Sequence, residues 1–141
     1  MMRTLYGPTA VLTFVLGIIT PFAAAASEKS LAVELNALDA LSTSCRVTFV
    51  ASNKTDAALQ GLGYEVVLFG KDGGIERMTK FDFGALPVGK TVVRRFDFAD
   101  TACANIGRVL INGSSRCEAS DDLDCDARLV PTNRTAVEFG K

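Results

Sequence analysis

Residues 62–83 read LGYEVVLFGKDGGIERMTKFDF. From Leu62 to Leu68 every second residue is apolar or aromatic, which is the period of a strand that buries one face. Residues 71–74, Lys-Asp-Gly-Gly, carry a turn signal, and residues 75–83 have the composition of a returning strand. This stretch therefore predicts a β-hairpin.

Similar short runs lie on both sides of the hairpin, separated by turns rich in Gly, Asp and Asn. No window shows sustained helical periodicity with capping residues. Seven short strands in one domain are typical of an antiparallel sandwich. We therefore expect an all-β fold, a seven-stranded antiparallel immunoglobulin-like β-sandwich, with strands near residues 31–36, 45–51, 62–68, 75–83, 91–98, 108–112 and 127–139, the last interrupted at Pro131.

One arginine does not fit the alternation cleanly. Arg94 has the same parity as Phe96 and Phe98, which belong on the buried face of their strand. Either Arg94 lies at the rim of the sheet or a β-bulge shifts the register at this point. The sequence leaves both alternatives open.

The first 26 residues have the features of a secretory signal. Arg3 is the only charged residue before Glu28, residues 10–19 are mostly apolar, and residues 23–26 are four alanines suited to cleavage. We expect a cleaved signal peptide over residues 1–26 and one immunoglobulin-like domain over residues 27–141. The product would be periplasmic or secreted, with no stable membrane insertion after cleavage.

Composition excludes several classes of function. The 141 residues include 15 Lys and Arg against 16 Asp and Glu, so the chain lacks the basic excess of a nucleic-acid-binding protein. It contains no histidine, which excludes Ser-His-Asp triads and histidine-ligated zinc. We expect no enzymatic activity, no catalytic residues, no cofactor, no metal site and no nucleic-acid partner.

The four cysteines all follow the predicted signal peptide, and an even number in an exported chain predicts disulfides. If consecutive strands run antiparallel, Cys45 and Cys103 lie at one end of the sandwich and Cys117 and Cys125 at the other. Any other pairing must span a strand of about 15–20 Å, whereas a disulfide allows a Cα separation of only about 4.4–6.8 Å. We predict the pairs Cys45–Cys103 and Cys117–Cys125.

Residues 84–91, GALPVGKT, match the phosphate-binding pattern G-x-x-x-x-G-K-T. That chemistry requires a helix after the loop, so that backbone N–H groups at its N-terminus bind phosphate. The residues after Thr91 instead have the composition of a strand. We interpret the motif as a hairpin loop in which Pro87 and the glycines set the turn.

An acidic run, Asp122-x-Asp124-x-Asp126, reproduces the first three ligand positions of a calcium loop. Ala127 occupies the position where that loop needs glycine, and Asn133 the position where it needs a bidentate glutamate. We interpret the run as a solvated acidic loop, with Asp126 entering the last strand. Three N-x-S/T triplets, at Asn53, Asn112 and Asn133, are interpreted as turn composition.

Residues 64–98 resemble the central hairpins of bacterial FxLYD-type immunoglobulin-like domains. Leu68-Phe69, Asp72-Gly73 and the loop Leu86-Pro87-Val88-Gly89 match the aliphatic-aromatic pair, the D-x-G turn and the L-P-x-G loop of those domains. The resemblance implies an immunoglobulin-like fold. The runs LAVELNAL, SCRVTFVA and RVLING, with the four cysteines, are also similar to a group of small exported bacterial proteins that bring no activity with them.

Immunoglobulin-like sandwiches usually act through loops at one end or through a sheet edge. The predicted strand order places residues 53–56, residues 86–90 and the acidic loop at the same end. We therefore expect a non-enzymatic binding or accessory module, with Asp121, Asp122 and Lys90 as probes of the interface with an unknown envelope protein or ligand. The alternatives are a structural subunit of an envelope assembly that pairs strand edges and, less favoured, a carboxylate-dependent hydrolase.

Overall fold

The computed structural model describes residues 29–141. The predicted signal peptide over residues 1–26 lies outside the described residues. Within residues 29–141, no helix is long and apolar enough to cross a membrane.

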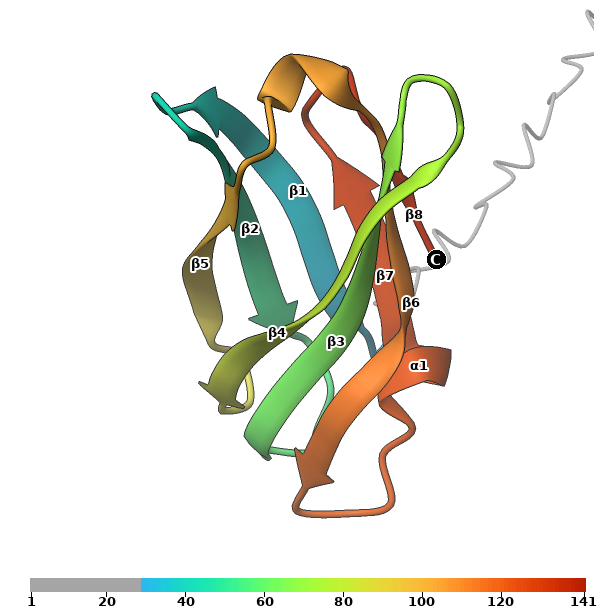
Figure 1. Ribbon diagram of the computed structural model, residues 1–141. Helices are drawn as coiled ribbons and strands as arrows, with labels where there is room; N and C mark the ends of the chain where they lie inside the picture. Colours follow the sequence, from blue (N-terminus) through green and yellow to red (C-terminus); the bar gives the residue numbers. More distant parts are fainter. Residues whose placement is uncertain (1–28) are drawn as a thin grey trace, which may run out of the picture.

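Two four-stranded sheets pack face to face (Figure 1). The first has the order β5-β2-β1-β7 and is formed by β1 (Leu31–Ala40), β2 (Ser44–Asn53), β5 (Thr91–Ala99) and β7 (Leu129–Asn133). The second has the order β4-β3-β6-β8 and is formed by β3 (Leu59–Gly70), β4 (Ile75–Leu86), β6 (Ile106–Ala119) and β8 (Glu138–Gly140). The predicted all-β sandwich is confirmed.

The last part of the chain differs from the prediction. The expected strand over residues 127–139 is divided into β7 and β8, and the break lies at residues 134–137 rather than at Pro131. Strand β7 pairs with β1 in parallel and β8 pairs with β6 in parallel, so the sandwich has eight strands and is not antiparallel throughout. The division allows the C-terminal segment to close one edge of each sheet.

Asp126 belongs to a helical turn and does not enter a strand. Helix α1 (Cys125–Arg128) begins after Asp124, whose carboxylate accepts hydrogen bonds from the backbone N–H groups of Asp126 and Ala127. A side chain that caps these free N–H groups stabilises a helical turn over an extended backbone. The strand therefore begins only at Leu129.

An aromatic cluster fills the space between the sheets. Phe49, on β2, is 1% exposed, and its ring centroid lies 5.8–6.1 Å from those of four other phenylalanines. These four are Phe81, Phe83, Phe96 and Phe139. Rings of Phe81 and Phe96 stack at 3.7 Å across the seam between β4 and β5. The alternation predicted that Phe96 and Phe98 face the core, and both pack there.

Arg94 lies at the rim of its sheet, which decides between the two alternatives. The pairing of β5 with β2 is continuous, so no bulge shifts the register. The half-buried Arg94 side chain reaches across the seam, where its Nε donates to the carbonyl oxygen of Phe83 on β4 at 3.0 Å. Arg77 on β4 donates from Nη2 to the carbonyl oxygen of Ala99 at 2.9 Å in the reverse direction. Two arginines thus link the neighbouring edges of the two sheets.

The two turns predicted to close hairpins, residues 71–74 and residues 87–90, have different structures. The turn between β3 and β4 is the predicted hairpin, in which Gly73 has a φ of 83° that favours glycine. Residues 87–90, by contrast, connect β4 in one sheet to β5 in the other, so the predicted hairpin at this loop was wrong. Strand β5 follows Lys90 directly, as predicted, and no helix is present there to bind phosphate.

Both predicted disulfides are confirmed. Cys45 is bonded to Cys103, with a Cα separation of 4.9 Å, and Cys117 is bonded to Cys125, with a Cα separation of 6.0 Å. Each bond joins a strand to a short helix in a connection between the two sheets. Cys45 on β2 is bonded to the first residue of η1 (Cys103–Asn105), which connects β5 to β6, and Cys117 on β6 is bonded to the first residue of α1, which connects β6 to β7.

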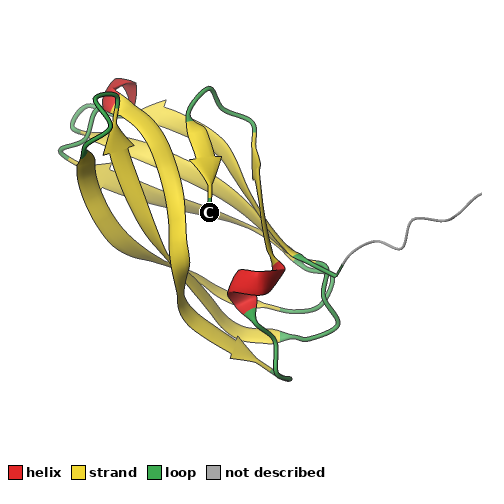
Figure 2. Ribbon diagram, turned by 90° about the vertical axis from the view of Figure 1, so that its right-hand side faces the viewer, coloured by secondary structure: helices red, strands yellow, loops and turns green. Residues whose placement is uncertain are grey.

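The sandwich has two distinct ends (Figures 1 and 2). We call the first the hairpin end; it contains the β1–β2 turn, the β3–β4 turn, η1 and the β7–β8 corner. We call the second the three-loop end; it contains residues 54–58, 87–90 and 120–124. In Figure 2 the two short helices, in red, lie toward opposite ends of the molecule.

Candidate functional site

The three loops that the sequence placed together do meet at the three-loop end. The backbone N–H of Asn53 donates to the carbonyl oxygen of Lys90 at 3.0 Å, and the N–H of Gly89 donates to the carbonyl oxygen of Asn53 at 2.8 Å. The third loop joins through Ser120, whose N–H donates to the carbonyl oxygen of Ala58 at 2.9 Å. Backbone hydrogen bonds therefore hold the three loops as one surface.

Asn53 is the centre of this arrangement. It is 1% exposed, and its amide nitrogen donates to the carbonyl oxygens of Ala57 and Leu86 at 2.8 and 2.9 Å. Its amide oxygen accepts from the N–H and the hydroxyl of Thr55. Because both ends of the amide are hydrogen-bonded, these bonds offset the cost of removing the side chain from water. Asn53 has a structural role and is not an exposed contact residue.

The predicted probes Asp121, Asp122 and Lys90 are exposed at this end. The hollows beside them are small: one of about 330 Å³ lies between residues 52–56 and 88–91, and one of about 180 Å³ lies against Asp121 and Asp122. The three-loop end therefore presents exposed acidic and basic side chains beside small hollows. Its use as an interface stays a prediction.

Two carboxylates of the acidic run after Cys117 are already bonded to protein groups. Asp124 caps α1, and Asp126 accepts from the N–H and the hydroxyl of Ser114 at 2.7 and 2.8 Å. In the part of the chain that the structure describes, no three His, Cys, Asp or Glu side chains gather in the way that a metal ion requires. These carboxylates have a structural explanation that the sequence analysis did not include.

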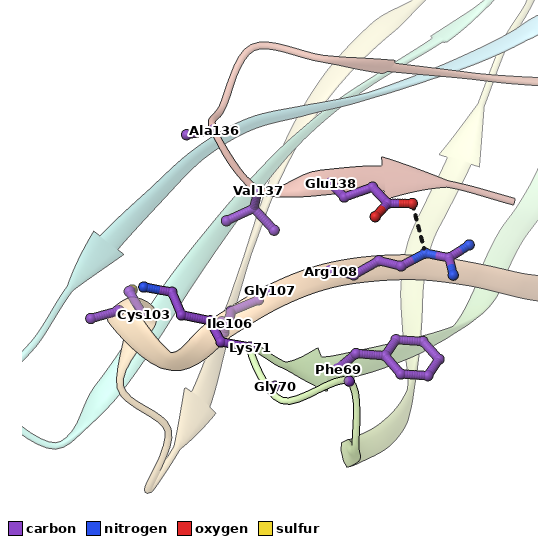
Figure 3. A pocket seen from close by; sticks show the side chains of 12 residues that line it. Phe69, Gly70, Lys71, Cys103, Ile106, Gly107, Arg108, Ala136, Val137 and Glu138 are labelled. Atoms are coloured by element: carbon purple, nitrogen blue, oxygen red, sulfur yellow. Dashed lines mark ion pairs between the residues drawn. The ribbon is translucent and has the colours of Figure 1, made fainter.

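A larger hollow, of about 710 Å³, lies at the hairpin end and is shown in Figure 3. Its lining comes from three segments distant in the sequence: residues 69–73 at the β3–β4 turn, residues 103–108 at the junction of η1 and β6, and residues 136–138 at the β7–β8 corner. It is an open groove rather than an enclosed cavity. We call it the hairpin-end groove.

Close backbone packing shapes the groove. Gly107, on β6, lies so near the β3–β4 turn that a Cβ atom there would come within 2.8 Å of the carbonyl oxygen of Gly70. Lys71 is bonded to the opposite segment, because its N–H donates to the carbonyl oxygen of Asn105 at 3.0 Å. The disulfide at Cys103 ties the same junction to β2. The groove is therefore preorganised by covalent and backbone contacts.

Arg108 contributes a positive charge to the lining of the groove, on the side of Phe69 and Glu138 (Figure 3). Its guanidinium carbon lies 5.5 Å from the centroid of the Phe69 ring, and its Nε lies 3.3 Å from Oε1 of Glu138 (Figure 3). Arg108 and Glu138 therefore form an ion pair. The Arg108 Nε atom is nevertheless buried without a hydrogen bond to any group in residues 29–141. The contact with Glu138 thus neutralises charge without satisfying the donor.

Sequence reasoning missed this groove for a physical reason. Phe69 and Arg108 face one another only because β3 and β6 pair in that register, and Glu138 joins them through the unexpected parallel pairing of β8. No motif spans these three positions in the sequence. The only available signal was the polarity of Arg108 at the start of an otherwise apolar strand.

Comparison with known proteins supports the fold. The solved structure of IrmA from Escherichia coli is similar to the chain with a TM-score of 0.58 over 78% of this chain and 97% of that chain, at 12% sequence identity. At this identity the similarity shows the fold alone. No protein-family model and no curated protein sequence matches the chain, so its resemblance to FxLYD-type domains stays a prediction.

Proposed function

We propose that this protein is an exported, non-enzymatic binding module that takes its ligand in the hairpin-end groove. The observation that carries the proposal is the groove itself, a preformed hollow of about 710 Å³ lined by apolar side chains together with Lys71, Arg108 and Glu138. Ligand sites in proteins usually have this character. Two disulfides support an oxidising compartment, the periplasm or the outside of the cell.

The ionisable groups of the groove favour binding over catalysis. They are Lys71, Arg108 and Glu138, and the glutamate is paired with the arginine. An arginine stays protonated at physiological pH, so it attracts negative charge but does not act as a general base. The groove therefore has the parts needed to hold a ligand rather than to transfer protons.

Site-specific photocrosslinking in the native host tests this proposal. A photoreactive amino acid replaces Lys71 in the groove, or Asp122 at the three-loop end, and Arg95 on the outer face of β5 provides a control position. All three side chains are exposed. We expect a discrete crosslinked product from position 71 and none from positions 122 and 95, with each variant exported at the normal level.

The other outcomes are equally informative. A product from position 122 alone would transfer the binding site to the three-loop end, where the sequence analysis expected it. The same set of products from all three positions would show non-specific contact, and no product from any of them would contradict a binding function.

A further inference from the structure

The hairpin-end groove contains a hydrogen-bond donor that has no partner in the described part of the chain. Of the buried side-chain nitrogen and oxygen atoms in residues 29–141, Arg108 Nε alone has no hydrogen-bond partner. A buried donor left unsatisfied destabilises the folded state, more so when the group is charged. A ligand that accepts a hydrogen bond from this atom would remove that cost.

The surroundings of Arg108 select an acceptor of a particular shape and charge. The Phe69 ring, 5.5 Å from the guanidinium carbon, supports one side of the planar group. A guanidinium donates two parallel hydrogen bonds to a carboxylate, a geometry that a lysine does not reproduce. The Arg108 side chain is 40% exposed, so an incoming group can reach it.

Glu138 is held only loosely beside the guanidinium of Arg108. Its side chain is 70% exposed, and Oε1 approaches Nε at 3.3 Å without hydrogen-bond geometry. An exposed ion pair contributes little to stability, so the glutamate can turn toward solvent at small cost. With Glu138 displaced, Arg108 and Lys71 leave the groove positively charged, which complements a negative ligand.

The open shape of the groove indicates the size of the ligand. Small-molecule sites usually enclose most of their ligand, whereas this groove is open to solvent and is bounded by three chain segments. A segment of polypeptide lying across it would cover the apolar walls and place one side chain or chain end at Arg108.

We infer that the hairpin-end groove binds an acidic peptide segment whose carboxylate displaces Glu138 and bonds to Arg108. This inference rests on the proposed function and names the ligand class of the same groove. The carboxylate comes either from an acidic side chain or from a chain terminus, and the two sources require different peptides in the test.

The test uses three pentapeptides and the ¹⁵N-labelled exported protein. One acetylated and amidated peptide has a central glutamate, the second has glutamine in its place, and the third is the glutamine peptide with a free C-terminal carboxylate. Binding is followed by NMR at the backbone amides of Gly70 and Gly107 and at the Arg108 Nε–H. We expect at least one carboxylate peptide to bind about tenfold more tightly than the neutral peptide, a difference of about 1.4 kcal/mol.

Variants then assign the effect to Arg108. Arg108→Lys keeps the charge but loses the paired donors, and we expect it to weaken binding of the carboxylate peptide about tenfold. Arg116→Lys is the matched control, because Arg116 is on the same strand with a side chain 41% exposed and is paired with Asp82 and Glu118. Glu138→Gln removes the competing carboxylate and should tighten binding about threefold.

Each outcome decides the inference. Equal binding of all three peptides, or an equal loss in Arg108→Lys and Arg116→Lys, would overturn the ligand class while leaving a binding role for the groove. Absence of binding by every peptide would also overturn the inference of an acidic peptide ligand. The proposed binding function would then be tested separately by the crosslinking from position 71. Superimposable amide spectra of the variants outside the groove show that folding is retained.

Discussion

The two ends of the sandwich contain the same corner in different surroundings. Residues 53–57, Asn-Lys-Thr-Asp-Ala, and residues 133–137, Asn-Arg-Thr-Ala-Val, each carry the chain from one sheet to the other. In both corners the amide oxygen of the asparagine accepts hydrogen bonds from the N–H and the hydroxyl of the threonine two residues later. The amide nitrogen of the asparagine donates to the carbonyl oxygen of the last residue of the corner, Ala57 or Val137. The N–H of that last residue donates to the threonine hydroxyl. Two of the three N-x-S/T triplets are therefore one structural motif.

Burial distinguishes the two corners. Asn53 is 1% exposed and also bonds to Leu86 and, through its backbone, to Gly89 and Lys90. Asn133 is exposed, and among residues 29–141 its side chain bonds only within its own corner. The disulfides differ in the opposite direction, because the longer ring is at the end with the exposed corner. The bond at the hairpin end joins cysteines 58 positions apart in the sequence, and the bond at the three-loop end joins cysteines 8 positions apart.

This contrast shows that the two ends are stabilised differently. The hairpin end depends on a long covalent ring, and the three-loop end depends on a buried polar network supported by a short ring. A local motif can thus make the same hydrogen bonds at two places and still contribute unequal amounts to stability, because the cost of breaking a bond depends on whether water can replace it.

Removing the disulfides tests the contrast most strongly. We expect Cys45→Ala with Cys103→Ala to lower the free energy of unfolding by about 4 kcal/mol, and Cys117→Ala with Cys125→Ala by between about 2 and 3 kcal/mol, because the longer ring restricts the unfolded chain more. Urea denaturation of the two double variants measures both values. Equal losses would mean that ring length does not distinguish the two ends.

The two asparagines provide a matched pair. Asn53→Ala leaves the buried carbonyl oxygens of Ala57 and Leu86 without these donors, and we expect it to lower the free energy of unfolding by about 3 kcal/mol. Asn133→Ala removes the same local bonds in a place open to water and should lower it by about 1 kcal/mol. Urea denaturation compares them, and similar losses would contradict the role assigned to burial.

The smallest expected effect concerns the tie between β3 and α1 near the three-loop end. The buried Tyr64 hydroxyl donates to the carbonyl oxygen of Cys125 at 3.1 Å, and burial raises the pKa of Tyr64 above the usual value for tyrosine. Above pH about 10 the unfolded chain loses a proton that the folded chain keeps, so the free energy of unfolding falls as pH rises.

Tyr64→Phe should lower the free energy of unfolding by about 1 kcal/mol at neutral pH, through the lost hydrogen bond. It should also flatten the alkaline decline, since no tyrosine then titrates within residues 29–141. Urea denaturation of both proteins between neutral pH and about pH 11 measures the two effects. Parallel curves would show that Tyr64 ionisation does not contribute.

Much of the fold follows from local pattern. Alternating apolar residues located the buried faces of the strands, and the order of the strands along the chain was enough to pair Cys45 with Cys103 and Cys117 with Cys125. The same strand order brought residues 53–56, residues 86–90 and the acidic loop to one end. These features depend on period and chain direction, and both can be read without knowing which sheet a strand joins.

The remaining features depend on pairing between distant segments. Residues 87–90 cross between the two sheets because β4 and β5 belong to different sheets. For the same reason Arg94 on β5 can bond to β4 across the seam between the sheets. The parallel pairing of β8 with β6 likewise depends on which sheet β8 joins. The groove with Phe69, Arg108 and Glu138 exists only after these pairings form. Alternation reports which side of a strand is buried, but the partner across a strand is chosen by the packing of the whole chain, which a linear pattern does not encode.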